Sequence, residues 1–154
     1  MVHRKSKEQE ASEVMILEGT WRSNVNFLSV PIELVEQFKG RVSKNDWVVW
    51  ADWYNKCPSI WNLAFVSKEG VVEAFMYGSW EPLERELRVI RITVNKGLYS
   101  YSGVIMQEAI DVLRILAKKM EVRFVYFETT AWKVFLRKLK GEVKLSKAKI
   151  LEVL

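Results

Sequence analysis

Apolar and polar positions along residues 60–94 predict three consecutive β-strands. Ile60–Val66 and Val71–Tyr77 are rich in β-branched and aromatic residues, and Ser67-Lys68-Glu69-Gly70 between them is typical of a hairpin turn. A third run, Leu87–Val94, follows. Strict alternation along this run divides its side chains between two faces. One face is expected to carry Ile90, Ile92 and Val94, and the other Leu87, Val89, Arg91 and Thr93.

The clearest helical pattern covers Gly103–Met120, where polar and apolar positions recur at helical spacing. Val122–Phe127 is almost continuously apolar, as expected of a strand that is covered on both faces. After it we expect a short helix at Trp132–Leu139 and one or two strands within Glu142–Leu154.

The first third of the chain gives a weaker pattern. Residues 1–10 are polar and are expected to form a flexible tail. Ser12–Val30 is expected to contain a strand, and Pro31 starts a helix that Gly40 ends. The segment Asn45–Tyr54 is rich in tryptophan, and its pattern leaves both helix and strand open.

This order of elements predicts a single α/β domain over residues 11–154. The strand–helix–strand unit from Leu87 to Phe127 implies a right-handed crossover and a locally parallel strand pair. The hairpin before it implies antiparallel strands, so the sheet is mixed, an α+β arrangement. The sequence contains no internal repeat and no linker that would divide it further.

Composition supports a folded, cytoplasmic protein. The 154 residues are 49% hydrophobic, which is enough to form a core, yet no apolar run approaches the roughly 20 residues that span a bilayer. The basic start His3-Arg4-Lys5-Ser6-Lys7 leads into polar residues, so we do not expect a signal peptide or a membrane partner. The single cysteine, Cys57, allows no internal disulfide and fits a reducing compartment.

The net charge of +5 is unevenly distributed. Residues 133–149 contain seven basic residues and one acid, which gives that segment +6 and the remainder of the chain −1. Such a segment suits an anionic partner, either nucleic acid or a phosphate-bearing cofactor, but it is also what a solvated lysine face looks like.

Several kinds of catalytic and metal site are excluded. The only histidine is His3, so a Ser-His or Cys-His pair inside the fold is not expected. One cysteine and one histidine are too few for a structural zinc site, which needs four such ligands. Neither G-x-x-x-x-G-K-[ST] nor G-x-G-x-x-G occurs. The three glutamates before the third strand, Glu81, Glu84 and Glu86, form either a solvated loop or the source of one general base.

The turn from Val94 into the helix near Gly103 is the expected ligand site. Open α/β sheets bind ligands at the carboxyl ends of parallel strands, and helix N-termini attract phosphate. The turn also offers Lys96 and several hydroxyls, while Gly97 and Gly103 are expected to relax its backbone. An ordinary connection capped by Ser102 is the alternative interpretation.

The order of elements over roughly Ile60 to Leu154, together with two segments within it, resembles the GNAT superfamily of acyl-CoA-dependent N-acetyltransferases. Ser100-Tyr101-Ser102-Gly103-Val104-Ile105 stands where that family has its pyrophosphate loop, Q/R-x-x-G-x-G/A, with Gly103 on the first glycine. Ser100 replaces the usual Gln or Arg, and Ile105 the usual Gly or Ala. The second segment, Phe135-Leu136-Arg137-Lys138-Leu139-Lys140-Gly141-Glu142, is similar to the family's F-Y-x-K-L-G-F, with Leu136 in place of the tyrosine that often protonates the departing thiolate.

The resemblance implies a mostly antiparallel sheet with one central parallel pair and flanking helices, and acetyl-CoA as co-substrate. The thioester arm would lie along the backbone of Ile92, Thr93 and Val94, and the pyrophosphate on the N–H groups of Ser102, Gly103, Val104 and Ile105. Glu86 or a bound water would take the proton from an amine acceptor, and Tyr101 is the candidate acid in place of the missing tyrosine.

Two other interpretations stay open. A non-catalytic protein of the same fold would bind nucleic acid or a protein through segment 133–149. In an unrelated mixed fold, the strands at Leu87–Val94 and Val122–Phe127 would not splay apart. The tryptophans at positions 47, 50, 53 and 61 are assigned to core or interface rather than to base stacking. An exposed strand at Ile150–Leu154 would allow a homodimer.

Overall fold

The structure, a computed structural model, describes residues 18–127, 143–145 and 149–152. Its strands form one seven-stranded sheet of order β1-β2-β3-β4-β5-β7-β6. The strands are β1 (Gly19–Ser23), β2 (Ile60–Ser67), β3 (Val72–Glu81), β4 (Glu86–Val94), β5 (Phe124–Phe127), β6 (Val143–Leu145) and β7 (Lys149–Glu152). All neighbouring strands are antiparallel except β4 and β5, which are parallel. The expected mixed sheet with one central parallel pair is therefore confirmed.

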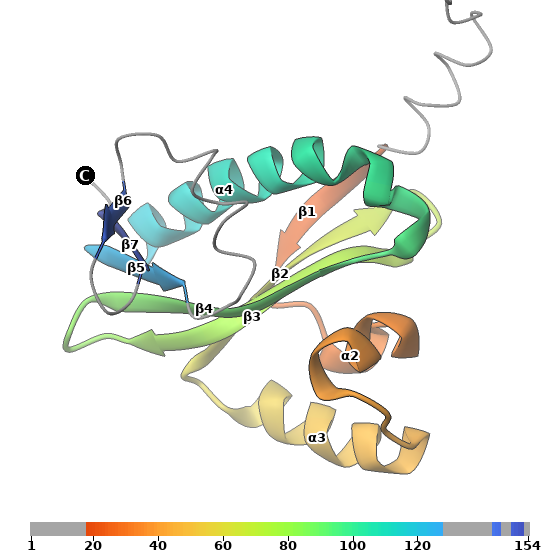
Figure 1. The fold of residues 1–154 in the computed structure, drawn as a ribbon. Helices are drawn as coiled ribbons and strands as arrows, with labels where there is room; N and C mark the ends of the chain where they lie inside the picture. The colour runs from red at the N-terminus through yellow and green to blue at the C-terminus, as the bar shows by residue number, and fades with distance from the viewer. Residues whose placement is uncertain (1–17, 128–142, 146–148, 153–154) are drawn as a thin grey trace, which may run out of the picture.

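Helices cover both faces of this sheet (Figure 1). The long helix α4 (Ser102–Lys119) lies across one face, while α2 (Ile32–Lys39) and α3 (Lys44–Lys56) lie on the other. Two 3-10 helices, η1 (Phe27–Ser29) and η2 (Lys96–Tyr101), precede α2 and α4. Among the described residues, no helix is long and apolar enough to cross a membrane.

Each face of the sheet has its own core. Buried side chains of α4, among them Ile110 and Leu113, pack on Leu63, Met76 and Leu87. On the opposite face, an aromatic cluster joins η1, α2 and α3 to β2 and β3. Its members include Phe27, Phe38, Trp47, Tyr54, Phe75 and Tyr77. The ring of Phe27 stands 5.2 Å from that of Phe75 and 5.0 Å from that of Tyr54, measured between centroids.

The hairpin and the first helix agree with expectation. The amide of Gly70 donates to the carbonyl of Ser67 at 2.9 Å, and Gly70 takes the positive φ of 81° that such a turn requires. Gly40 ends α2 with a φ of 72°. The segment whose pattern was ambiguous is helical, since α3 extends from Lys44 to Lys56.

The expected strand within Ser12–Val30 exists among the described residues of that segment, but it does not include the apolar residues at the segment's end. β1 occupies Gly19–Ser23, and the following residues leave the sheet so that Phe27 and Val30 can pack into the aromatic core. The apolar run before β1 lies outside the described residues, as do the tail 1–10 and the expected helix Trp132–Leu139.

The face assignment along β4 was wrong. Leu87 and Val89 pack on the α4 side, and so do Ile92 and Val94, whereas Ile90 packs against the aromatic core. Parity changes within the strand because one extra residue is inserted there, so strict alternation from Leu87 to Val94 does not apply.

The reason given for a homodimer was also wrong. Within the described residues, β7 is not an exposed edge, because it pairs with β5 on one side and with β6 on the other.

Candidate functional site

β4 contains a β-bulge at Ile90. Val89 pairs with Gly78 of β3 and Arg91 pairs with Tyr77, so that Ile90 has no register partner in β3. A bulge of this kind bends the strand and disturbs its hydrogen-bond ladder locally.

Gly78 of β3 and Trp61 of β2 lie against the bulge. A β-carbon added to Gly78 would stand 1.6 Å from the carbonyl oxygen of Arg88, so only glycine lets the two strands approach this closely. The indole Nε1 of Trp61 donates to the carbonyls of Ser79, at 3.0 Å, and Arg88, at 3.2 Å. Trp61 thus joins β3 and β4 across the irregularity.

Among the described residues, the edge of β4 facing β5 has no strand partner beyond the bulge. β5 pairs with Glu86–Val89 only, and no described residue of β5 pairs with Ile90–Val94. The amide of Asn95 donates to Glu73 of β3 at 2.8 Å, and alternation then directs the backbone groups of Ile92 and Val94 to the opposite edge. A ligand with amide groups could pair there as an additional strand.

One group of this open edge already has a partner from α2. The side-chain amide of Gln37 donates to the carbonyl of Val94 at 3.0 Å. Thr93 is different from its neighbours, because alternation turns its backbone groups toward β3 and its hydroxyl donates to Phe75 at 3.5 Å. Of the three residues expected to hold a thioester arm, Ile92 therefore offers the most complete set of backbone groups.

The turn after β4 contains no glycine-rich loop. The side chain of Asn95 accepts from the amide of Gly97 at 2.9 Å and thereby caps η2, which continues directly into α4. Neither Gly97 nor Gly103 has a positive φ, so the expected relaxation of the backbone by these glycines is absent. Ser102 is the first residue of α4 and not its N-cap.

The side chain of Ile105 leaves the phosphate-loop position unobstructed. It is fully buried and packs with Phe65, Val94 and Leu98. Only the backbone of Ile105 can therefore contribute to a ligand site at the start of α4, which is how a helix N-terminus binds phosphate. The neighbouring Val104 is about half exposed.

The two expected catalytic residues lie far apart. Glu86 begins β4, whereas Tyr101 follows its end, and at about 3.3 Å per residue the strand alone separates them by roughly 25 Å. Glu86 is in a separate polar group: its carboxylate is 3.7 Å from the guanidinium of Arg88. Burial, and then the adjacent Glu86 carboxylate, raise the pKa of Tyr126.

A cluster of polar side chains that the sequence did not reveal lies beside the bulge, on the face of the sheet covered by α2 and α3. The ammonium of Lys39 donates to the hydroxyl of Tyr54 and lies 4.4 Å from the ring centroid of Trp50. The ring centroids of Tyr54 and Tyr77 stand 5.8 Å apart, and Tyr77 is the register partner of Arg91. Burial raises the pKa of Tyr77 strongly, so its phenol is neutral.

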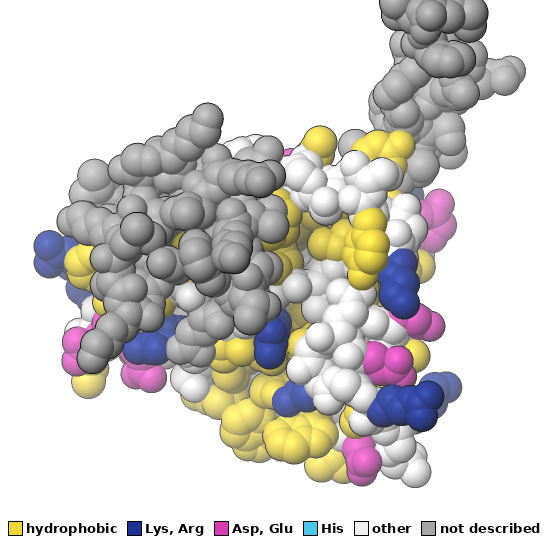
Figure 2. All heavy atoms as spheres, viewed as in Figure 1, with side chains coloured by type: hydrophobic (Ala, Val, Ile, Leu, Met, Phe, Trp, Pro, Cys, Tyr) yellow, Lys and Arg dark blue, Asp and Glu magenta, His cyan; other side chains and the backbone are white. Residues whose placement is uncertain are grey.

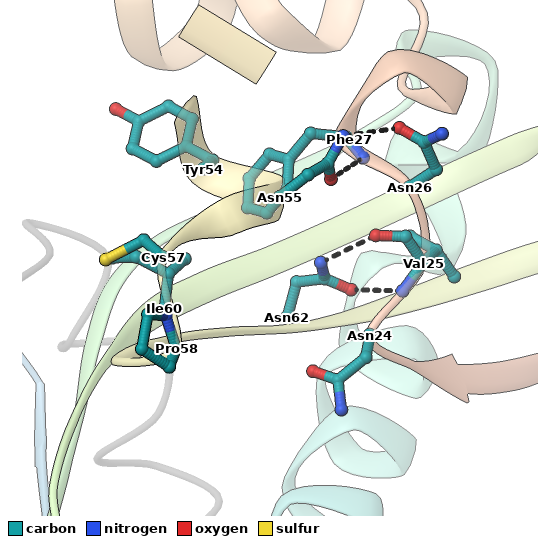
Figure 3. A pocket seen from close by; sticks show the side chains of 10 residues that line it. All are labelled: Asn24, Val25, Asn26, Phe27, Tyr54, Asn55, Cys57, Pro58, Ile60 and Asn62. Atoms are coloured by element: carbon teal, nitrogen blue, oxygen red, sulfur yellow. Dashed lines mark hydrogen bonds between the residues drawn. The ribbon is translucent and has the colours of Figure 1, made fainter. Parts of the chain in front are cut away.

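A hollow of about 490 Å³ lies beside Tyr54, on the side away from its hydroxyl (Figure 3). Asn62 binds both backbone groups of Val25, accepting from the amide at 2.8 Å and donating to the carbonyl at 2.9 Å. Asn55 accepts from the amide of Phe27 at 2.9 Å. These amides hold the wall of the hollow together, and the hydroxyl of Tyr54 points away from it.

A hydrophobic surface lies over α3, where Figure 2 shows apolar side chains gathered at the molecular surface. Trp50 and Trp53 are 47% and 55% exposed, whereas Trp47 and Trp61 belong to the core. The described residues contain no group of three or more His, Cys, Asp or Glu side chains that could hold a metal ion.

No family model matches the sequence, and no curated protein matches it. Solved structures match the fold. An aminoglycoside acetyltransferase from an uncultured soil metagenomic sample, in complex with sisomicin, has a TM-score of 0.64 at 9% identity and covers 82% of this chain and 90% of its own. GCN5 of Tetrahymena has a TM-score of 0.60 at 8% identity, covering 88% and 96%.

A third match is a protein of Desulfovibrio desulfuricans assigned to the GNAT family, with a TM-score of 0.60 at 11% identity, covering 88% of this chain and 99% of its own. Similarity over most of both chains at such identities establishes the fold, which is that of the GNAT acetyltransferases.

Proposed function

We propose that this chain is an acyl-CoA-dependent N-acetyltransferase that transfers an acetyl group from acetyl-CoA to an amine by direct attack. The observation that supports this most is the open edge of β4. It begins at the bulged Ile90 and runs toward η2, which leads into the N-terminus of α4, within a fold shared with acetyltransferases.

The proposed acetyl-CoA site follows this edge. The amide-bearing arm would pair with the backbone of Ile92 and its neighbours Thr93 and Val94, as an added strand does. The pyrophosphate would lie at the first turn of α4, on the N–H groups of Ser102, Gly103, Val104 and Ile105, where the helix dipole favours negative charge. Exposed Lys96 adds a positive charge to this end.

The proposed chemistry relies on positioning. The amine nitrogen attacks the thioester carbonyl carbon, the carbon–sulfur bond breaks, and the thiolate takes up a proton. A disturbed ladder at Ile90 leaves backbone N–H groups that can stabilise the oxyanion at the point where β4 and β5 separate. Holding amine and thioester in line supplies most of the rate, with acid–base help secondary.

The acid–base roles remain part of the proposal. Glu86 lies roughly 13 Å along β4 from Ile90, so it would accept the amine proton only through ordered water. Tyr101 is half-buried at the start of α4, from which it would protonate the departing thiolate.

The test is acetyl transfer itself. Purified protein is incubated with acetyl-CoA and a panel of amines, and thiol release is measured together with the mass of the product. We expect amine-dependent thiol release. Glu86→Gln and Tyr101→Phe test the two assigned roles by their effects on the pH profile.

Absence of transfer, together with nucleic-acid binding that weakens steeply with salt, would favour the non-catalytic alternative based on segment 133–149. That segment lies mostly outside the described residues, which include only positions 143–145 and 149 of it.

A further inference from the structure

Two half-buried cations lie on the α2/α3 face beside the bulge. Arg91 directly follows the bulged Ile90 and is the register partner of Tyr77. Lys39, at the end of α2, lies above the sheet and contacts the pair formed by Tyr54 and Tyr77 through the hydroxyl of Tyr54. Arg91 therefore borders the point where β4 loses its pairing with β5, and Lys39 is connected to Arg91 through the contact of Tyr54 with Tyr77.

Neither cation has an acidic partner within the part of the chain that the structure describes. The ion pairs found there join Asp52 to Lys56, Glu18 to Lys68 and Glu86 to Arg88. Taking a charge partly out of water without a counter-ion costs free energy, so half-buried cations bordering the same aromatic cluster favour an anion bound between them.

The neighbouring tyrosines complete the polar character of this place. The rings of Tyr54 and Tyr77 pack together with their centroids 5.8 Å apart, and the aromatic core keeps Tyr77 buried. Because Tyr77 remains neutral, it adds no negative charge that could neutralise Arg91. An arginine fork and a lysine beside phenols match the geometry and charge of a carboxylate.

We propose that Arg91 and Lys39 bind a carboxylate on the acceptor, so that the substrate is an amine that also carries a carboxylate, as an amino acid does. The assignment to an acceptor rests on the proposed acetyl transfer, whereas the binding of a carboxylate amine does not. The bulge is where we place the thioester, and Arg91 adjoins it on the face opposite α4.

The position also separates this place from the proposed pyrophosphate site. Arg91 lies roughly 10 Å along β4 before Val94, after which η2 still intervenes before α4. A positive environment has a further consequence for an amine acceptor, since nearby cations disfavour its protonated form and so favour the nucleophilic one.

Direct binding tests the proposal without requiring turnover. L-Phenylalanine, L-methionine and L-lysine, each compared with its own α-amide, are titrated into the full-length chain while tryptophan fluorescence is followed. We expect at least one acid to bind about tenfold or more tightly than its amide, because a charge-assisted bidentate contact is lost with the carboxylate. Arg91→Gln should remove this preference, and Arg91→Lys should restore part of it.

A matched control separates a specific contact from net charge. Arg41→Gln removes the same charge from an exposed position just after α2 and should leave the preference intact. Thermal unfolding of each variant shows whether the fold is retained, and Lys39→Gln provides an independent removal of the second cation. Equal binding of every acid and its amide by the wild type, or an unchanged preference in both Arg91→Gln and Lys39→Gln, would overturn the proposal.

The same variants distinguish this proposal from the proposed function. If the protein binds carboxylate amines but transfers no acetyl group to them, the anion site stands and the acetyltransferase proposal fails. If it acetylates amines with no preference for a carboxylate, the enzyme stands and the acceptor assignment fails.

Discussion

The backbone of Gly78 in β3 lies directly against the carbonyl of Arg88 in β4. A β-carbon at Gly78 would come within 1.6 Å of that oxygen and within 3.0 Å of the Trp61 ring. This approach is what allows β4 to accommodate Ile90 as an extra residue while still pairing with β3 on both sides of it. The open edge of β4 therefore depends on a glycine in the neighbouring strand.

Gly78→Ala should be strongly destabilising. Backbone atoms of Arg88 occupy the space, and overpacking of this kind costs about 1–3 kcal/mol or more. Gly97→Ala is the matched control, because its β-carbon would meet only the side chain of Asn95 at an ordinary 3.5 Å. Urea unfolding of both variants makes the comparison, and equal stability of the two would contradict the close approach.

Trp61→Phe should lower stability while keeping an aromatic ring in the core. The variant leaves the carbonyls of Ser79 and Arg88 without their shared donor, at a cost of about 1–3 kcal/mol. Trp21→Phe removes an exposed indole bond to Glu108 and should cost at most about 1 kcal/mol. Chemical denaturation measures both losses, and a smaller loss at Trp61 than at Trp21 would argue against a role in holding the bulge.

Asn62→Leu should destabilise the wall of the hollow in Figure 3. The buried amide of Asn62 satisfies both backbone groups of Val25, and their loss should cost about 1–3 kcal/mol. Asn45→Leu, an exposed change in α3, serves as the control and should be nearly neutral. Slower amide exchange of Val25 in Asn62→Leu than in the wild type would be incompatible with this assignment.

Tyr77 should make the protein sensitive to alkali. Burial raises the pKa of Tyr77 above that of an unfolded tyrosine, so the folded state keeps a proton that the unfolded state loses. The contribution of the protonated Tyr77 to the free energy of unfolding is fully present below about pH 10. Above that pH it falls by up to about 1.4 kcal/mol per pH unit. The unfolding free energy of Tyr77→Phe, measured from pH 8 to 11, should decline less steeply than that of the wild type. Parallel curves for the two proteins would refute the role of this phenol.

Much of the architecture could be predicted from local signals. The hairpin turn ending at Gly70, the helix ending at Gly40 and the long amphipathic helix before β5 all appear close to their expected bounds. Each depends on neighbouring residues, either a glycine at positive φ or a repeat of apolar positions, which a single sequence displays directly.

The bulge could not be read from β4 alone. Ile90 is apolar like Leu87, Val89, Ile92 and Val94, so the change from odd to even positions is hidden and nothing marks the inserted residue. The informative signal was Gly78 in the partner strand, since a glycine inside a strand often marks a bulge or a close approach. Strict alternation consequently grouped Arg91 with Leu87 and Val89, which pack on the α4 side, and concealed its place beside Tyr77.

The helix α3 was ambiguous for a different reason. Trp47, Ala51 and Tyr54 form its buried stripe at helical spacing, but Trp50 and Trp53 are large and apolar as well, although they are about half exposed. Exposed tryptophans blur the contrast between the two sides of a helix, and with it the periodicity. The cluster of Lys39, Tyr54 and Tyr77 depends on this helix, so it too was missed.

Calorimetric titration of acetyl-CoA into the protein tests the central claim most directly. We predict saturable binding in the wild type, weakened about tenfold or more in Gly103→Glu, because a carboxylate in the first turn of α4 repels the pyrophosphate. Ile115→Glu adds the same charge at an exposed position farther along α4 and should bind like the wild type. Absence of heat in the wild type at high micromolar acetyl-CoA, or equal affinity in Gly103→Glu and Ile115→Glu, would contradict the account.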